Sequence, residues 1–260
     1  MSLLLRAKYH LSYFLNAVNQ HSLQAPFIFD LYTKIIKSDK LNGDFSEIEA
    51  IRTALLRNNA QVEITQLGAG SKKDSSNQRT IRNIASGGLT TPKYSALLYR
   101  LIKYFNMRHI VELGTSFGVN TMYLAKYEAT KVSTFEGNHA IAKIAQENLS
   151  RIGVKNVNII EGNIDQTLSV FLDGSIKPDL VYMDANHTYE ATLRYFNKIV
   201  HDKHDKTIVV IDDIKWSSGM QNAWIKIIEN PEVTLSVDLN KCGLVFFNPD
   251  FTKQHYVLNF

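Results

Sequence analysis

Acidic and amide side chains stand at the ends of the apolar runs that predict β-strands in this chain. They are Glu112, Glu136, Glu161 with Gly162 and Asn163, Asp184, and Asp212 with Asp213. In open α/β sheets, ligands bind beyond the carboxyl ends of the strands. Polar residues leaving a core account for one or two such positions but poorly for five in succession. Side chains of this kind could hold ribose hydroxyls, and grouped carboxylates could bind a hard divalent cation.

The most informative segment is HIVELGTSFGVN, which covers residues 109–120. A short apolar run ends at Glu112, turns through Gly114 and Gly118, and opens into an amphipathic segment that predicts a helix. Glycine lets a ligand approach bare backbone, and the start of a helix offers N–H groups that lack intrahelical partners. The next predicted strand ends at Glu136, 24 positions after Glu112. An acidic residue at about that distance holds a ribose hydroxyl in nucleotide-binding α/β folds.

The glycine spacing narrows the class of ligand. Gly114 and Gly118 form a G-x-x-x-G pattern, whereas dinucleotide-binding turns carry G-x-G-x-x-G, so a site for a pyrophosphate is disfavoured. Besides a dinucleotide site, two interpretations of residues 109–120 stay open from this segment alone. It could bind a different nucleotide, or it could be a glycine-capped strand–turn–helix that binds nothing.

Strands and helices alternate from residue 109 onward. Strands are predicted at 109–113, 131–136, 156–160, 179–184 and 207–212, and helices at 118–127, 138–151, 165–172, 187–200 and 218–229. This alternation predicts a parallel sheet that is covered by helices on both faces. Two further strands, at 233–239 and 243–248, are joined by a short turn and predict a C-terminal β-hairpin.

The first third of the chain has a different pattern. Residues 1–60 show apolar positions at helical spacing, and residues 61–91 are rich in Gly, Ser, Asn and Lys. A loop of that length is usually functional or disordered, and here it could form a lid over a substrate or a surface loop without function. Thr91-Pro92 then predicts a helix start. We therefore divide the chain into a helical N-terminal region with a lid loop, 1–91, and a ligand-binding domain, 92–260.

The segment VELGTSFG resembles the first motif of the class I S-adenosylmethionine-dependent methyltransferases, whose parallel sheet also ends in a β-hairpin. The resemblance implies an α/β fold with a Rossmann-like, seven-stranded, mostly parallel sheet and S-adenosylmethionine as cofactor. It implies that Glu136 binds both ribose hydroxyls and that Asn163 lies near the adenine amino group. The residues that would hold the methionine part of the cofactor are Glu112, Gly114, Thr115, Ser116, Gly118 and Asn120.

Two later segments, DLVYMDANHTYEATLRYF (179–196) and IVVIDDIKWSSGM (208–220), resemble the O-methyltransferase branch of that family. In its cation-dependent members the matching positions bind one divalent ion, and in this sequence they are Asp184, Asp212 and Asp213. Three carboxyl groups form a hard oxygen site suited to Mg²⁺, and such an ion lowers the pKa of a bound hydroxyl. The resemblance thus implies O-methylation with possible assistance from Mg²⁺.

A metal-free interpretation of the same residues stays open. Asp184 could bind the methionine ammonium, Asp212 could cap the following turn, and His187 could be the catalytic general base. His187 stands where the small-molecule branch often has lysine, and HDKHDKT (201–207) replaces the Gly-Gly that many relatives carry before the fifth strand. Both departures argue against carrying over a catechol-type acceptor.

Composition limits the class of protein further. The chain of 260 residues is 45% hydrophobic, has a formal net charge of +4 and contains one cysteine, Cys242. These values favour a cytoplasmic globular protein without an intrachain disulfide. The resemblance to O-methyltransferases, and not the composition, implies a small-molecule acceptor. We expect no nucleic-acid partner because no dense Lys/Arg cluster is present, and neither a signal peptide nor a membrane span is predicted. The sequence leaves open whether the chain forms a homo-oligomer.

Two rival functions belong to other classes. A nucleotide-dependent oxidoreductase would share the α/β alternation, but the G-x-x-x-G spacing and the terminal hairpin argue against it. A catalytically silent Rossmann-like binding protein would keep the fold and lose the chemistry. Intact Glu112, Glu136 and Asp184 argue against that interpretation.

Overall fold

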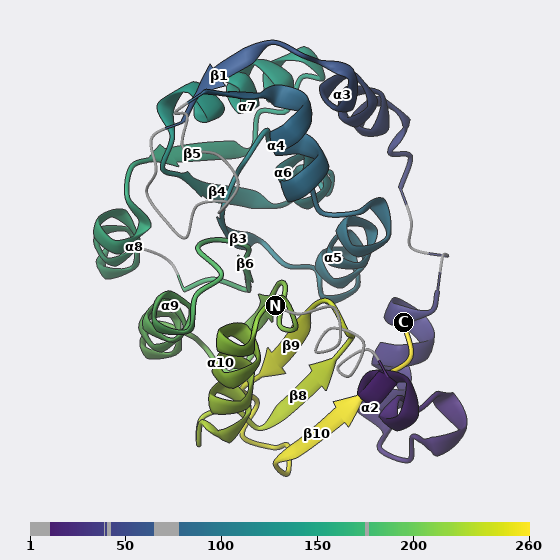
Figure 1. Cartoon of the computed structure of the whole chain (residues 1–260). Helices are drawn as coiled ribbons and strands as arrows, with labels where there is room; N and C mark the ends of the chain where they lie inside the picture. The colour runs from purple at the N-terminus through teal and green to yellow at the C-terminus, as the bar shows by residue number, and fades with distance from the viewer. Residues whose placement is uncertain (1–10, 39, 41–42, 65–77, 175–176) are drawn as a thin grey trace. The chain divides into compact units, whose positions relative to one another are not determined.

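The computed structural model describes residues 11–38, 40, 43–64, 78–174 and 177–260 (Figure 1). The chain divides into two compact units. The terminal unit consists of Lys177–Phe260 and the described part of Met1–Lys40, and the central unit is the described part of Leu41–Ile176. Among the described residues, no helix combines the length and the apolar character that crossing a membrane requires.

The central unit is built on three parallel strands and the helices between them. Its elements are α3 (Ser46–Arg57), β1 (Gln61–Glu63), β2 (Gln78–Thr80), α4 (Ile81–Gly88), α5 (Pro92–Phe105), β3 (His109–Leu113), α6 (Val119–Ala125), β4 (Lys131–Glu136), α7 (His139–Arg151), β5 (Val157–Glu161) and α8 (Ile164–Asp173). Strand β4 lies between β3 and β5 and pairs with both in parallel, while β1 and β2 form a separate antiparallel pair. The carboxyl ends of β3, β4 and β5 therefore meet at one edge.

Helices α5, α7 and α8 begin at the capping residues or the proline present in the sequence. Asn138 caps α7 by accepting a hydrogen bond from the N–H of Ile141, and Asn163 caps α8 by accepting one from Asp165. Helix α5 begins at Pro92 as predicted, although the Thr91 side chain makes no capping hydrogen bond. Asn138 follows β4 and Asn163 follows β5, so these two caps determine where the chain turns away from the ends of the strands.

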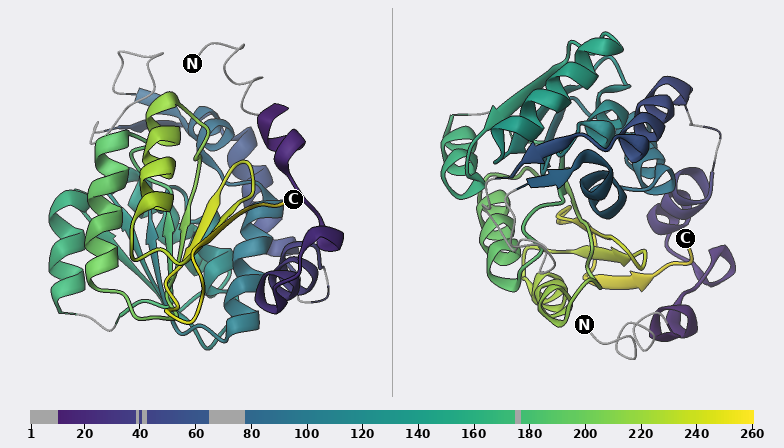
Figure 2. Two further views of the ribbon diagram at one scale, coloured as in Figure 1. Left: turned by 90° about the horizontal axis from the view of Figure 1, so that it is seen from below. Right: turned by 45° about the horizontal axis from the view of Figure 1, so that its top comes forward.

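The terminal unit carries the remaining strands. Its elements are η1 (Gln20–Ser22), α2 (Pro26–Asp30), the π-helix η2 (Leu31–Ile36), β6 (Leu180–Met183), α9 (Tyr189–His201), β7 (Ile208–Ile211), α10 (Ser218–Glu229), β8 (Leu235–Asp238), β9 (Gly243–Phe246) and β10 (Gln254–Val257). Strands β6 and β7 are parallel, β9 runs antiparallel to β7 and β8, and β10 is parallel to β8. Helices α9 and α10 pack side by side (Figures 1 and 2).

The predicted fold class is confirmed, because both units are α/β and most of their strand pairs are parallel. The predicted hairpin is β8–β9. Strand β10 was not predicted, so the described residues contain one strand more than the seven expected after residue 108. In the terminal unit the N-terminal segment lies beside the C-terminal one (Figure 2): the Tyr13 hydroxyl donates to the carbonyl of Leu258 at 2.6 Å, and Phe27 packs against Phe246.

Gly243 is expected to be intolerant of any side chain. A Cβ atom at this position would lie 2.4 Å from Cη2 of Trp224, whose ring is 4% exposed. Gly243→Ala should lower the free energy of unfolding by about 1–3 kcal/mol because the core cannot absorb the added methyl group. Gly87→Ala is the control, since a Cβ there meets nothing within 4 Å and alanine favours the helix by up to about 1 kcal/mol. Urea denaturation should move the two midpoints in opposite directions; equal shifts would contradict the clash.

Candidate functional site

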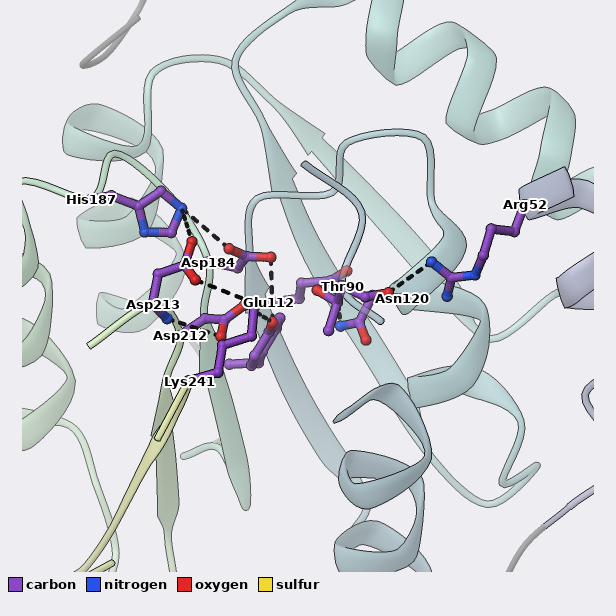
Figure 3. Close-up of polar contacts among 10 residues, drawn as sticks. Arg52, Thr90, Glu112, Asn120, Asp184, His187, Asp212, Asp213 and Lys241 are labelled. Carbon is purple, nitrogen blue, oxygen red and sulfur yellow. Dashed lines mark hydrogen bonds and ion pairs between the residues drawn. The ribbon is translucent and has the colours of Figure 1, made fainter. Parts of the chain in front are cut away.

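The carboxylate of Glu112 forms the centre of a buried polar network in the central unit. Figure 3 draws it together with Asn120, one member of that network. Oε1 accepts from the Asn120 amide at 2.8 Å, and Oε2 accepts from the hydroxyls of Thr121 at 2.5 Å and Thr134 at 2.7 Å. Since the Thr134 proton is donated to Glu112, the Thr115 hydroxyl is the donor in its 2.7 Å contact with Thr134. Glu112 thereby joins the end of β3 to the start of α6 and to β4.

The turn between β3 and α6 has an unusual backbone. Gly114, Ser116 and Gly118 all have positive φ, at 104°, 49° and 78°. The N–H groups of Gly114 and Thr115 both donate to the carbonyl of Phe135, which fixes the turn against β4. A Cβ on Gly118 would meet Ala145 of α7 at 3.4 Å, an ordinary contact distance, so it is the positive φ that favours glycine at this position.

Glu136, at the end of β4, is turned toward this loop. Its Oε2 accepts from the N–H of Ser116 at 2.9 Å, and its Oε1 accepts from the N–H of Asn138 at 3.0 Å. Burial raises the pKa of Glu136, and the backbone N–H groups of Asn138, Ser116 and Gly137 oppose that rise. Each carboxylate oxygen has a second lone pair, so the side chain can still accept hydrogen bonds from two hydroxyls.

The residues of the turn fit the polar groups of S-adenosylmethionine. The Asn120 side chain is 8% exposed, and its Oδ1 has no hydrogen-bond partner among the described residues. A buried carbonyl oxygen without a donor is costly. An ammonium group placed there would supply the donor next to the negative charge of Glu112, which suits the methionine end of the cofactor.

Asn163 has a structural role in addition to the predicted one. Its Oδ1 caps α8 through the N–H of Asp165 at 3.0 Å, and its carbonyl accepts from the hydroxyl of Thr167. The predicted contact with the adenine amino group stays a prediction.

In the terminal unit, the ends of β6 and β7 bring together Asp184, His187, Asp212 and Asp213 (Figure 3). Nε2 of His187 lies 3.2 Å from Oδ1 of Asp184 and 4.0 Å from Oδ2 of Asp213. Asp212 is 1% exposed, and its Oδ2 accepts from the Tyr182 hydroxyl at 2.7 Å. The four residues thus form one acidic cluster with a single imidazole.

Strained backbone supports this cluster. Asn186, His187 and Asp213 all have positive φ, at 64°, 35° and 53°. A positive φ costs free energy in residues other than glycine, and such strained residues are frequent at functional sites. The Asn186 amide donates to the Tyr195 hydroxyl on α9, which holds the strained loop in place.

The charged side chains of the cluster shift one another's pKa values. Burial acts to lower the pKa of His187, but the hydrogen bond to Asp184 and the charges of the three aspartates outweigh it and raise that pKa. Burial and the charge of Asp212 raise the pKa of Asp184 and of Asp213, while His187 and Lys241 oppose the rise. A base with a raised pKa beside an orienting carboxylate is suited to accepting a proton from a hydroxyl.

The predicted magnesium ligands do not fit a divalent ion as they stand. The Lys241 ammonium is ion-paired with Oδ2 of Asp212 and lies 3.5 Å from Oδ1 of Asp213. Oδ1 of Asp212 accepts from the N–H of Asp213 at 2.9 Å, so both oxygens of Asp212 are engaged. A different set, with Asp184, His187 and Asp213, has ligand atoms within 4.8 Å of one another. The metal ligands therefore stay a prediction.

The sequence did not predict several hydrogen-bond and ion-pair partners of the Glu112 network and of the acidic cluster. Thr134 stands opposite Glu112 in the register of β3 and β4, and Tyr182 lies two residues before Asp184 on β6. Both follow from the alternation of a strand once the register is known. Lys241 lies in the short turn of the predicted hairpin. Because Ile211 pairs with Gly243, that turn is brought to the level of Asp212 and Asp213.

The strand order within each unit, the glycine turn and the carboxylates at the strand ends define a class I methyltransferase fold. A family model described as a methyltransferase domain matches residues 111–214. The predicted enzyme class, a methyltransferase, is thereby confirmed. No curated protein matches the sequence.

Solved structures with the same fold include three methyltransferases with bound cofactor. They are the S-adenosylhomocysteine-bound methyltransferase PaMTH1 of Podospora anserina (11% identity, TM-score 0.61, covering 87% of this chain and 97% of that one), the O-methyltransferase TomG of Streptomyces achromogenes, involved in tomaymycin synthesis and in complex with S-adenosylmethionine (17%, 0.60, 83% and 96%), and the O-methyltransferase of Bacillus cereus in complex with S-adenosylhomocysteine (17%, 0.57, 87% and 99%). At such identities the likeness shows a shared fold.

Proposed function

We propose that this chain transfers a methyl group from S-adenosylmethionine to the hydroxyl oxygen of a small molecule. The observation that carries the proposal is the buried Asn120 carbonyl oxygen that lacks a donor beside Glu112, in a chain with a methyltransferase domain. The solved neighbours with S-adenosylmethionine or S-adenosylhomocysteine bound support the cofactor. O-methyltransferases among them support an oxygen acceptor.

The central unit would bind the cofactor. Asn120 and Glu112 would accept hydrogen bonds from the ammonium of its methionine part, Glu136 would accept them from both ribose hydroxyls, and Asn163 would lie near the adenine amino group. Gly114, Thr115, Ser116 and Gly118 shape the turn so that the cofactor can approach the backbone. When bound, S-adenosylmethionine supplies an electrophilic methyl group.

The terminal unit would supply the base. His187 would take the proton of an acceptor hydroxyl, and Asp184 would keep the imidazole oriented and stabilise it once protonated. General-base catalysis contributes roughly 10²–10⁴-fold, and positioning of the two reactants contributes the larger part of the rate. A contact between Asp184 and the cofactor, also predicted from the sequence, is an alternative role for that carboxylate.

Calorimetric titration with S-adenosylhomocysteine tests the cofactor. Wild type should bind, and Glu136→Ala should weaken binding by about 1.5–3 kcal/mol, roughly 10–150-fold, which is the range of a hydrogen bond to a charged group. Glu161→Ala is the control, because this glutamate ends the neighbouring strand β5 but is 49% exposed and paired with His139. It should leave the affinity unchanged.

Two outcomes would contradict the proposal. Absence of S-adenosylhomocysteine binding by wild type would favour a silent binding protein, and binding of NAD⁺ instead would favour an oxidoreductase. If the cofactor binds, a panel of phenols, sugars and other alcohols should reveal the acceptor through release of S-adenosylhomocysteine.

A further inference from the structure

Lys241 brings a positive charge into the acidic cluster from a turn outside the sequence motifs. It lies between β8 and β9, and its ammonium pairs with Asp212 and lies 3.5 Å from Asp213. The Lys241 side chain is 29% exposed, while its partner Asp212 is almost completely buried. An ion pair with one buried member is screened little by solvent.

Backbone hydrogen bonds on both sides of Lys241 fix the turn that carries this side chain. The carbonyl of Lys241 accepts from the N–H of Ile214, which links the hairpin turn to the loop after β7. Within the turn, Leu239 and Cys242 are joined by a backbone hydrogen bond of 2.9 Å, and the N–H of Asn240 donates to Oδ1 of Asp238. These contacts make the lysine part of the folded framework of the cluster.

The cluster therefore already contains a cation. A lysine side chain ordinarily carries a positive charge at neutral pH, and the Lys241 ammonium lies against the carboxylates of Asp212 and Asp213. A divalent ion bound by Asp212 and Asp213 would have to displace this ammonium or stand close to it, and two like charges at short range repel strongly in a partly buried site.

We propose that Lys241 is the resident cation of the cluster formed by Asp184, Asp212 and Asp213, and that its ammonium excludes a divalent ion there. Lys241 is a positioning residue: it neutralises part of the negative charge and holds Asp212 and Asp213 in place. The importance of this arrangement for methyl transfer rests on the proposed function, whereas the exclusion of metal does not. It follows that methyl transfer by this chain needs no divalent cation.

Titration with Mn²⁺, followed by electron paramagnetic resonance of the free ion, tests the exclusion without cofactor or acceptor. Wild type should show no saturable site, and Lys241→Met should gain one that binds Mn²⁺ at least roughly tenfold more tightly than any residual binding by wild type. Lys215→Met is the control, because Lys215 is another ion-paired lysine of the same unit, 13% exposed against 29% for Lys241, and its partner, Asp238, lies outside the cluster. It should behave like wild type, and Asp213→Asn added to Lys241→Met should abolish the new site.

The proposal is overturned if wild type binds one Mn²⁺ and Asp213→Asn removes it, because the native cation is then a metal held by Asp184, His187 and Asp213. It is also overturned if Lys241→Met keeps its circular dichroism spectrum and gains no site. Should that variant fail to fold, chelation decides on wild-type protein: turnover that EDTA abolishes and Mg²⁺ restores would refute the proposal, and turnover that EDTA leaves unchanged supports it. Failure of the proposed function would show instead as absence of S-adenosylhomocysteine binding.

Discussion

Replacing Glu112 with glutamine is expected to lower the free energy of unfolding by about 2–4 kcal/mol and to weaken S-adenosylhomocysteine binding. The carboxylate is fully buried and accepts hydrogen bonds from Asn120, Thr121 and Thr134. An amide in its place turns an NH₂ group toward one of these donors, so a buried donor loses its acceptor. Urea denaturation would measure the stability, and calorimetric titration would measure the affinity.

The matched control for this change is Glu161→Gln. Glu161 also ends a parallel strand of the central unit, but its side chain is 49% exposed and its partner His139 is 82% exposed. Exposed pairs contribute about 0–1 kcal/mol, so the control should alter stability by less than that. Similar small losses in both variants would show that the Glu112 network does not hold the turn together.

Glu112 also shows how far the sequence predicts this site. Its type, its position after an apolar run and the glycines that follow predicted the turn, because each is a local property. Its partner Thr134 is 22 residues away and meets it only because β3 and β4 pair in parallel with these two residues opposite each other. Local pattern predicts the strands but not their register, so the network could be recognised only in the folded chain.

The same distinction applies to elements outside the two sites. Leu11 and Leu15 belong to the apolar positions at helical spacing in residues 1–60, yet they are 61% and 76% exposed, while Tyr13 between them is 3% exposed. Tyr13 is buried because its hydroxyl reaches the carbonyl of Leu258 and accepts from the N–H of Phe260. Lys241 is a similar case, since its role depends on a hairpin register that joins it to residues 29 positions away. Both side chains are placed by tertiary contacts that periodicity does not encode.

Replacing His187 with glutamine is expected to lower kcat by roughly 10²–10⁴-fold for any hydroxyl acceptor that the wild type methylates, with little change in affinity for S-adenosylhomocysteine. Glutamine can still donate a hydrogen bond to Asp184, but it cannot take the proton from the acceptor. His204→Gln is the matched control, because His204 also lies 3.1 Å from an aspartate, Asp179, in the same unit. It stands before β7 rather than after β6, away from the strand ends that carry the cluster, and should leave kcat unchanged.

The pH dependence separates a base from a residue that only supports the fold. His187 acts as a base when deprotonated, and its pKa is raised above 6.5, so kcat should rise with pH through a midpoint above that value. Asp212 and Asp213 also act on His187 through their charges, and the Lys241 ammonium lies 3.5 Å from Asp213. Replacing Asp184 with asparagine removes both a hydrogen bond and a charge that raise the pKa of His187, so the midpoint should move to lower pH. A purely structural role would lower activity without moving the midpoint, and a profile that Asp184→Asn leaves in place would remove His187 from the proposed chemistry.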